Sequence, residues 1–158
     1  MKIYALMENI SHDECLACEH GLSLYIEADG KKILFDTGAS EKFAENAEKM
    51  GVDLKAVDFA AISHGHYDHG GGLAKFIELN DHAPIYISDK GFNQYYSGTD
   101  FNVSIPEGLE GNERFVLTNA PIKLSENITL LNCNDREAKY YADPYGLNKL
   151  VDGEFIPD

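Results

Sequence analysis

Residues 60–72, "AAISHGHYDHGGG", place three histidines and one aspartate within six consecutive positions, followed by three glycines. The apolar run "VDFAAIS" (57–63) that leads into them is typical of a strand buried on both faces. Residues i and i+2 that leave a strand in extended conformation project to the same side. We therefore expect His64 and His66 to offer two imidazoles to one cation, and Asp68 and His69 to face a second point nearby.

Imidazole and carboxylate groups together form a ligand set for zinc, iron or manganese. The alternative is a flexible loop whose histidines lie in solvent. Four potential ligands in six residues, directly after a buried strand, favour the metal site. We therefore predict a divalent cation, zinc first with iron or manganese as alternatives, at His64, His66, Asp68 and His69.

The composition and net charge of the chain argue against some classes of binding partner. The chain has 158 residues, which suits a single domain, and a formal net charge of −14. A field of that sign repels phosphate backbones and anionic lipid, so we expect no nucleic-acid partner and no membrane partner. We see no secretory signal at the N-terminus and no apolar run long enough to cross a membrane. Three cysteines are too few for a disulfide framework, so we predict a cytoplasmic location.

Hydrophobic periodicity predicts mixed strands and helices, and so an α/β architecture. We expect antiparallel pairing between the two strands at 114–119 and 128–134. The segment 91–112 reads as a long surface loop, and the tail 139–158 as mostly irregular. The remaining elements that we expect are a strand at 2–7, a hairpin at 22–38 around Asp29-Gly30, a helix at 40–50 capped by Ser40, a strand at 57–63, a helix at 71–79 and a strand at 83–88.

These residues resemble the metallo-β-lactamase superfamily, whose H-x-H-x-D-H signature is matched by His64, His66, Asp68 and His69. Asp36 in "ILFDTG" is similar to the family's aspartate at a strand end, which supports the metal loop. The segments "ALMEN" and "EHGLSLYIE" resemble more specifically the superfamily II metal-dependent hydrolases, a subgroup that includes archaeal dihydropterin-ribofuranosylaminobenzene-phosphate synthases. The resemblance implies an αββα sandwich, of which residues 1–158 would form a single partial domain containing the first sheet and its helices.

The resemblance also implies a reaction. A complete member binds two metals, the first held by His64 and His66, and the second by Asp68 and His69, each with later histidines. Activated water then attacks an ester, an amide or a phosphate-type centre, or a transfer displaces pyrophosphate. Asp68 thereby belongs to the catalytic machinery, and Asp36 would orient a ligand histidine. His20, with Glu19 beside it, lies on the side where the family's pocket opens, although His20 could equally be a structural loop residue.

The sequence departs from that family after His82, because no histidine follows it. The later metal ligands have no candidate, so the chain looks like the N-terminal half of a subgroup member. We expect one or two ions bound weakly, and self-association or a complementing chain that covers an exposed apolar face. The alternative function is a catalytically incomplete fragment or binding module that acts through such association.

Two further patterns leave alternatives open. Cys15 and Cys18 form an isolated C-x-x-C, which is either a thiol redox or zinc pair or two incidental thiols. Several tyrosines could line a site for a flat aromatic substrate, although core or interface packing is their commoner use. They are Tyr95, Tyr96, Tyr140, Tyr141 and Tyr145.

Overall fold

The computed structural model describes residues 1–131 and 146–158, and its largest element is a six-stranded mixed sheet. The first three strands in spatial order are antiparallel neighbours, and the last four run parallel to one another. In that order the strands are β1 (Lys2–Met7), β2 (Ser23–Ala28), β3 (Lys31–Phe35), β4 (Phe59–Ala61), β5 (Ile85–Ser88) and β8 (Phe115–Thr118).

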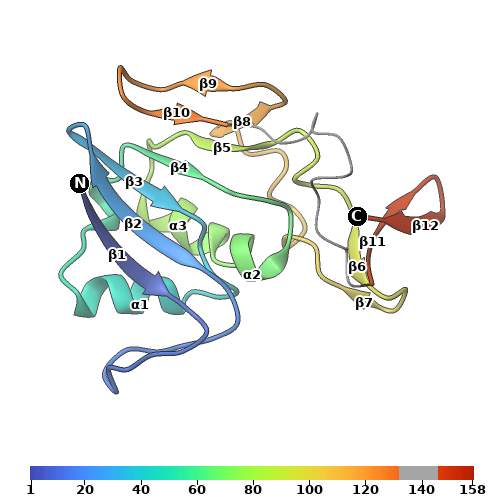
Figure 1. Ribbon diagram of the computed structural model, residues 1–158, viewed down its shortest axis with the longest axis horizontal. Coiled ribbons are helices and arrows are strands. Elements are labelled where there is room, and N and C mark those ends of the chain that lie inside the picture. Colours follow the sequence, from blue (N-terminus) through green and yellow to red (C-terminus); the bar gives the residue numbers. More distant parts are fainter. Residues whose placement is uncertain (132–145) are drawn as a thin grey trace.

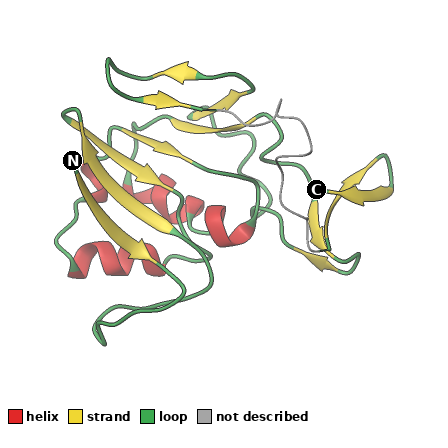
Figure 2. Ribbon diagram, in the orientation of Figure 1, coloured by secondary structure: helices red, strands yellow, loops and turns green. Residues whose placement is uncertain are grey.

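Helices cover one face of this sheet, and they lie behind it in Figure 1. They are α1 (Lys42–Lys49), the 3-10 helix η1 (Leu54–Ala56), α2 (Tyr67–Gly70) and α3 (Leu73–Leu79). The core lies between the two layers. Leu34, Ala60 and Ile85 are register partners across three parallel strands, and they pack in one cluster with Phe43 of α1 and Phe76 of α3. Figure 2 shows this separation of helices from strands. The predicted α/β class is confirmed.

The opposite face of the six-stranded sheet is also apolar, but it is only partly covered. Ile26 pairs with Ile33, and Ile33 with Phe59, so their side chains share this face. Ile33 and Phe59 are buried, whereas Ile3 at the β1 edge is 53% exposed. We call the incompletely buried residues of this face the open face. They are Ile3, Leu24, Ile26, Phe35, Tyr86 and Val116.

Two small sheets complete the described structure. One joins β9 (Ile122–Lys123) to β10 (Thr129–Leu130), and Asn127 in the turn between them donates to the Asp29 carboxylate at 2.9 Å. The other has the order β12-β11-β6-β7. Its strands are β6 (Tyr95–Ser97), β7 (Phe101–Asn102), β11 (Leu147–Val151) and β12 (Glu154–Pro157).

The N-terminal elements confirm the sequence-based predictions, but three later predictions are wrong. The segment 91–112 is not a surface loop, because it contains β6 and β7 and buries Tyr95, Val103 and Ile105. The strands predicted at 114–119 and 128–134 are not neighbours, since β8 pairs in parallel with β5 while β10 pairs with β9. Residues 132–134 of the second one lie outside the described range.

The tail is the third correction. Residues 147–157 form the β11–β12 hairpin around Asp152-Gly153, both of which have positive φ (50° and 85°). Aspartate followed by glycine is a strong hairpin signal, because these two residues adopt that conformation at low cost. Residues 139–145 lie outside the described range. Within the part of the chain that is described, no helix is long and apolar enough to cross a membrane.

Candidate metal centre

The histidine turn begins where two parallel strands end side by side. β3 and β4 run in the same direction, so the residues that follow them, Asp36 and Ser63, meet at the same edge of the sheet. The Asp36 backbone N–H donates to the Ala61 carbonyl at 2.9 Å, which extends the pairing by one step. His66 then stands at the N-terminus of α2, and the short helix carries Asp68 and His69.

Asp36 is the anchor of the turn. It is fully buried, and its backbone φ is +58°, which aspartate tolerates better than most residues. The carboxylate accepts hydrogen bonds from the Ser63 backbone N–H at 2.7 Å and from the Ser63 hydroxyl at 2.8 Å. The same oxygen that accepts the hydroxyl lies 2.7 Å from Nδ1 of His69. Asp36 thus occupies the supporting position that the family resemblance implies.

This network determines which ring nitrogens are free. The single Ser63 hydroxyl proton goes to Asp36, so Ser63 Oγ, 2.9 Å from His64 Nδ1, accepts the proton of that nitrogen. His69 Nδ1 donates to Asp36 in the same way. A neutral imidazole with a protonated Nδ1 has its lone pair on Nε2. His64 can therefore offer Nε2 to a cation directly, and His69 can do so when the cation displaces its Nε2 proton. Each ring is held by a hydrogen bond on its other nitrogen, as metal-ligating histidines usually are.

His64, Asp68 and His69 differ in charge in the metal-free chain. Burial, reinforced by the neighbouring imidazoles of His69 and His66, lowers the pKa of His64 to about 4, so His64 is neutral. Burial also opposes the charge on His69, but hydrogen bonds to Asp36 and Asp68 outweigh it and raise the pKa of His69 to about 9. For Asp68, burial raises the pKa, yet His69 and His20 leave the net shift downward, so Asp68 is a carboxylate.

His64, Asp68 and His69 converge as a possible metal group. One ligand atom from each lies within 4.8 Å of the others, and no other group of three or more such residues meets that criterion among the described residues. Ligand atoms about 2.0–2.1 Å from a tetrahedral zinc ion lie about 3.3–3.4 Å apart. The Asp68 Oδ2–His69 Nε2 distance is 3.4 Å, and Asp68 Oδ2 lies 3.3 Å from Nε2 of His20. These donors fit a divalent cation in type and in spacing.

Backbone contacts hold the turn against the segment after β3. The carbonyl of His69 accepts the Thr37 N–H at 2.7 Å, and the carbonyl of Asp68 accepts the Leu22 N–H at 3.2 Å. Gly71 donates to the Gly38 carbonyl at 2.9 Å. A Cβ on Gly71 would collide with the Ala39 carbonyl oxygen. The glycines after the histidines are therefore required for close backbone approach as well as for turning the chain.

His66 is placed differently from the other three predicted ligands. It is 8% exposed, and its Nε2 is buried without a hydrogen-bond partner. The side chain packs against the ring of Tyr95, with ring centres 5.1 Å apart, and its Nε2 lies 3.4 Å from Oδ2 of Asp158. His66 therefore lies beside the three-residue group, with its ring centre 4.5 Å from that of His64, and its Nε2 faces the small sheet.

A model of the metallo-β-lactamase superfamily matches residues 16–145, which is most of the chain. The chain belongs to the metallo-β-lactamase superfamily. A relative from Methanocaldococcus jannaschii, a 7,8-dihydropterin-6-methyl-4-(beta-D-ribofuranosyl)-aminobenzene-5'-phosphate synthase, is 30% identical over 176 residues and covers 100% of this chain. A crystal structure of a metal-dependent hydrolase of the β-lactamase superfamily covers 99% of this chain with a TM-score of 0.79 and 27% identity.

A more distant relative also matches the chain. An anaerobic nitric oxide reductase flavorubredoxin from Aliivibrio fischeri is 27% identical over 153 residues, which is 85% of this chain and 31% of that protein. The chain spans 60% of the synthase and 56% of the hydrolase structure, so it corresponds to part of each relative. Superfamily membership agrees with a metal-dependent fold and with the His/Asp group of the turn.

The remaining residues that the sequence offered as site candidates lie outside the three-residue metal group. Glu19 lies at the start of α1, where its carboxylate accepts from the Ser40 hydroxyl at 2.8 Å and pairs with Lys42 at 3.3 Å. The Ser40 hydroxyl oxygen also accepts the Lys42 backbone N–H at 3.3 Å, as predicted for a cap, although Glu41 holds the N-cap position. Tyr95 is buried, and its hydroxyl donates to the Lys90 carbonyl at 2.8 Å. Tyr96 packs on Phe155. Cys15 and Cys18 are free and exposed. Tyr140, Tyr141 and Tyr145 lie outside the described residues.

Two residues that contact the histidines, Ser63 and Asp158, were not among the sequence-predicted candidates. Ser63 was treated only as the end of a strand, although its hydroxyl connects Asp36 with His64. Its position between an apolar strand and the first histidine was the available signal. Asp158 carried no signal in sequence, since only the pairing of β11 with β6 brings the residues of the tail to the turn.

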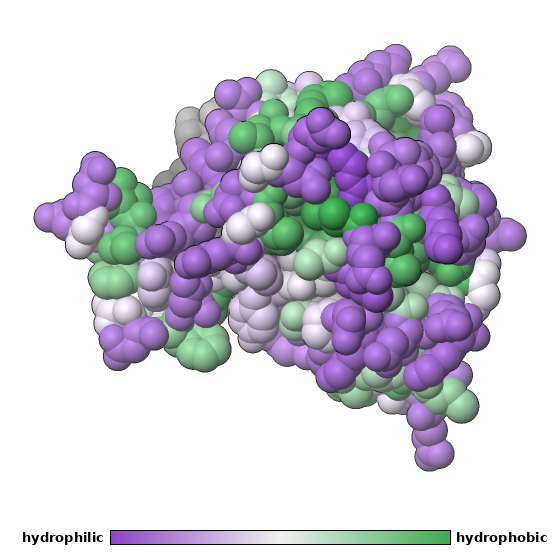
Figure 3. All heavy atoms as spheres, turned by 180° about the vertical axis from the view of Figure 1, so that it is seen from behind, coloured by the Kyte–Doolittle hydropathy of each residue, from purple (hydrophilic) through white to green (hydrophobic). Residues whose placement is uncertain are grey.

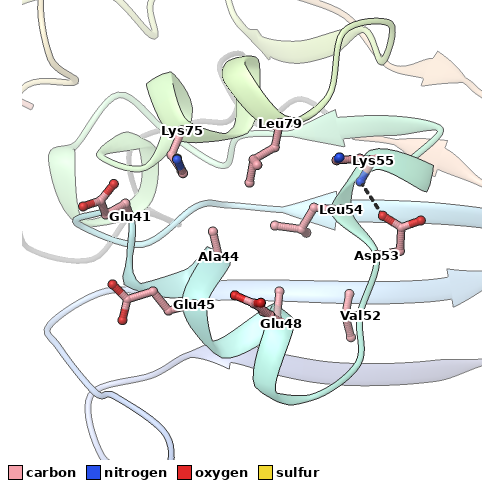
Figure 4. A pocket seen from close by; sticks show the side chains of 11 residues that line it. Glu41, Ala44, Glu45, Glu48, Val52, Asp53, Leu54, Lys55, Lys75 and Leu79 are labelled. Atoms are coloured by element: carbon pink, nitrogen blue, oxygen red, sulfur yellow. Dashed lines mark hydrogen bonds between the residues drawn. The ribbon is translucent and has the colours of Figure 1, made fainter.

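A separate groove of about 550 Å³ lies on the outer side of the helices. Figure 3 views the molecule from that side, and apolar side chains gather near the middle of this face among hydrophilic ones. In Figure 4, Ala44, Leu54 and Leu79 lie between α1 and α3, with Glu45 and Glu48 along the α1 border. No histidine lines this groove, so it offers none of the donors of the metal turn.

Proposed function

We propose that this chain binds a divalent cation, zinc first with iron or manganese as alternatives, through Nε2 of His64, Nε2 of His69 and a carboxylate oxygen of Asp68. The observation that supports this most strongly is the network of Asp36 and Ser63, which accepts the Nδ1 proton of both imidazoles and so directs both Nε2 atoms toward a cation. A buried carboxylate that accepts three hydrogen bonds beside these donors has a clear role as a support for ligands.

We further propose that the site serves hydrolysis of an ester, amide or phosphate-type substrate, or a pyrophosphate-displacing transfer. A bound divalent cation supplies Lewis acidity and can lower the pKa of water from 15.7 to about 7. The chain's own groups provide the rest. Asp68 stays ionised as an acceptor, and His20, whose side chain is 71% exposed, lies 3.3 Å from it on the solvent side and can contact an entering substrate.

The first experiment measures metal binding and turnover together. After zinc loading and dialysis, we expect at least one zinc ion per chain and slow hydrolysis of p-nitrophenyl acetate or bis-p-nitrophenyl phosphate. His69→Ala should lose both, because it removes a ligand and the partner of Asp36. His82→Ala is the matched control, since that histidine is exposed and pairs with Asp81 at 3.2 Å, apart from the turn.

The outcome separates two functions. Absence of bound metal in the wild-type chain would contradict the proposal as a whole. Metal that binds through His69 without turnover of any such substrate would favour the second candidate, a binding module that requires association. The open face supports this second candidate, because solvent-exposed apolar patches usually mark a surface for a partner.

We also propose that the open face is covered in solution, by a second copy or by a chain that supplies a second sheet. Ile3→Asp should weaken self-association because it places a charge on this face, whereas Ile10→Asp, at an exposed position outside it, should not. Sedimentation velocity over a range of concentrations measures the effect. A folded wild-type monomer at high concentration, with no complementing chain captured, would contradict this proposal.

A further inference from the structure

The groove on the outer side of the helices, between α1 and α3, has an apolar floor. Leu54 at its base is buried in the core cluster, and Ala44 and Leu79 are partly buried against the same cluster. The volume of about 550 Å³ lies within the range of about 300–1,000 Å³ that is common for binding pockets. The floor therefore offers apolar surface that a bound group would remove from water.

Three glutamates border the groove on the α1 side at helical spacing. Glu41 is the N-cap of α1, and Glu45 and Glu48 follow four and seven residues later, so the carboxylates share one face of the helix. All three residues are exposed, and no ion pair joins any of them within the described part of the chain. Like charges three and four residues apart on a helix repel one another. A positive group placed along this border would therefore stabilise it.

The opposite border of the groove does not balance this charge. Lys75 of α3 already pairs with Glu78 at 3.0 Å, and Lys55 of η1 lies next to Asp53, which also lines the groove. The whole chain carries a formal net charge of −14, so a second copy of the chain, a nucleic acid or an anionic membrane would be repelled from this face. Charge complementarity therefore selects a cationic occupant, and the apolar floor selects one that also has an apolar side.

We propose that the groove between α1 and α3 is a docking site for a basic amphipathic helix of a partner protein. The three glutamates span about 10 Å along α1, and a helix lying beside it presents lysine or arginine at the same repeat of three and four residues. Apolar side chains of that helix would enter the groove over Ala44, where the small side chain permits close approach. The site uses no residue of the metal turn, so it does not depend on the proposed function.

The test uses a labelled model peptide of leucine and lysine, about four helical turns long, with the two residue types on opposite faces. Fluorescence anisotropy at low salt measures its affinity, and amide chemical shifts locate it on the chain. We expect one peptide per chain, with shifts in α1, in residues 52–55 and in α3. Glu45→Gln with Glu48→Gln should weaken binding about tenfold, because two exposed ion pairs are lost. Glu107→Gln with Glu113→Gln is the matched control, since it removes the same charge at exposed positions outside the groove.

A second pair of variants tests the apolar floor. Ala44→Lys places a long cationic side chain in the groove and should prevent the peptide from binding. Ala74→Lys adds the same residue at an exposed position of α3 that does not line the groove, and it should leave the affinity unchanged. Circular dichroism checks that each variant is folded.

Three results would overturn the docking site. Equal weakening by the groove pair and by its matched control would show that only the net charge of the chain attracts the peptide. Peptide-induced shifts on the open face, with none in α1 or α3, would place the peptide elsewhere. Self-association of the wild-type chain that Ala44→Lys abolishes and Ala74→Lys does not would assign the groove to a second copy. Each result leaves the proposed metal binding standing, because that is measured separately.

Discussion

The two sides of the metal centre are held by different parts of the fold. His64 and His69 are fixed through Ser63 and Asp36 at the ends of β4 and β3, inside the six-stranded sheet. His66 instead contacts Tyr95 and Asp158, which belong to the small sheet at the side of the molecule. One side is supported by the core and the other by a peripheral hairpin.

The two sides therefore differ in how completely their histidine side chains are held before an ion binds. On the core side every ring nitrogen that faces the protein has a hydrogen-bond partner, so the ligands are arranged before any ion arrives. On the hairpin side the buried Nε2 of His66 has none, so its environment is incomplete without a further group. We therefore expect the core side to contribute more to metal affinity than the hairpin side.

The largest effect should come from Asp36→Asn. The substitution keeps the shape of the side chain but replaces an acceptor of three hydrogen bonds by an amide, whose NH₂ faces the donors of Ser63 or His69. We expect a loss of about 3 kcal/mol in the free energy of unfolding, because a buried charged partner is removed. Zinc affinity should fall about 10- to 100-fold. Urea unfolding and a chelator competition measure the two quantities.

Asp58→Asn is the control for this substitution. Asp58 also accepts a backbone N–H, from Lys32 at 2.7 Å, and pairs with Lys31, but it is partly exposed and remote from the histidines. Its loss should cost about 1 kcal/mol or less and leave zinc binding unchanged. Equal effects of both variants on zinc affinity would contradict the division between the two sides.

The same division explains what the sequence could predict. The strands up to residue 88, the helices and the histidine turn follow from apolar periodicity and from a local motif, and Asp36 followed from the resemblance. The strands β1 to β5 pair in chain order, so their neighbours along the chain are also their neighbours in the sheet. The match between prediction and structure is therefore closest on the core side of the centre.

The hairpin side could not be predicted in this way. β6 and β7 are short and rich in Tyr, Ser and Asn, so their pattern resembles that of a loop, and they become strands by pairing with β11, some 50 residues later. The Asp152-Gly153 turn was a readable local signal, yet it predicts only a hairpin and not the sheet that the hairpin joins. Asp158 lies beside His66 only because of this long-range pairing.

A change of pH tests the core side without removing any atom, and its effect on stability is spread over several pH units. In the metal-free chain, burial opposes the charge on His69, but hydrogen bonds to Asp36 and Asp68 raise its pKa to about 9, while burial and two neighbouring imidazoles lower the pKa of His64 to about 4. NMR titration of the imidazoles should therefore resolve His69 near pH 9 and His64 near pH 4. Two midpoints near the ordinary value of about 6.5 would contradict the network.

The sign of the stability change follows from these directions. The folded state holds the His69 proton more tightly than the unfolded state, so this contribution is complete below about pH 6.5 and is lost as the pH rises through about 9. The decline cannot exceed about 1.4 kcal/mol per pH unit for one proton.

In Asp36→Asn the decline in stability should be shallower, because one of the two carboxylates that hold the proton is gone. Saturating zinc should abolish it, since a cation at Nε2 replaces that proton. A metal-free wild type whose stability rises between pH 7 and 9 would show that His69 is not held in the charged form by Asp36. It would contradict the proposal that the core-side ligands are oriented before an ion binds.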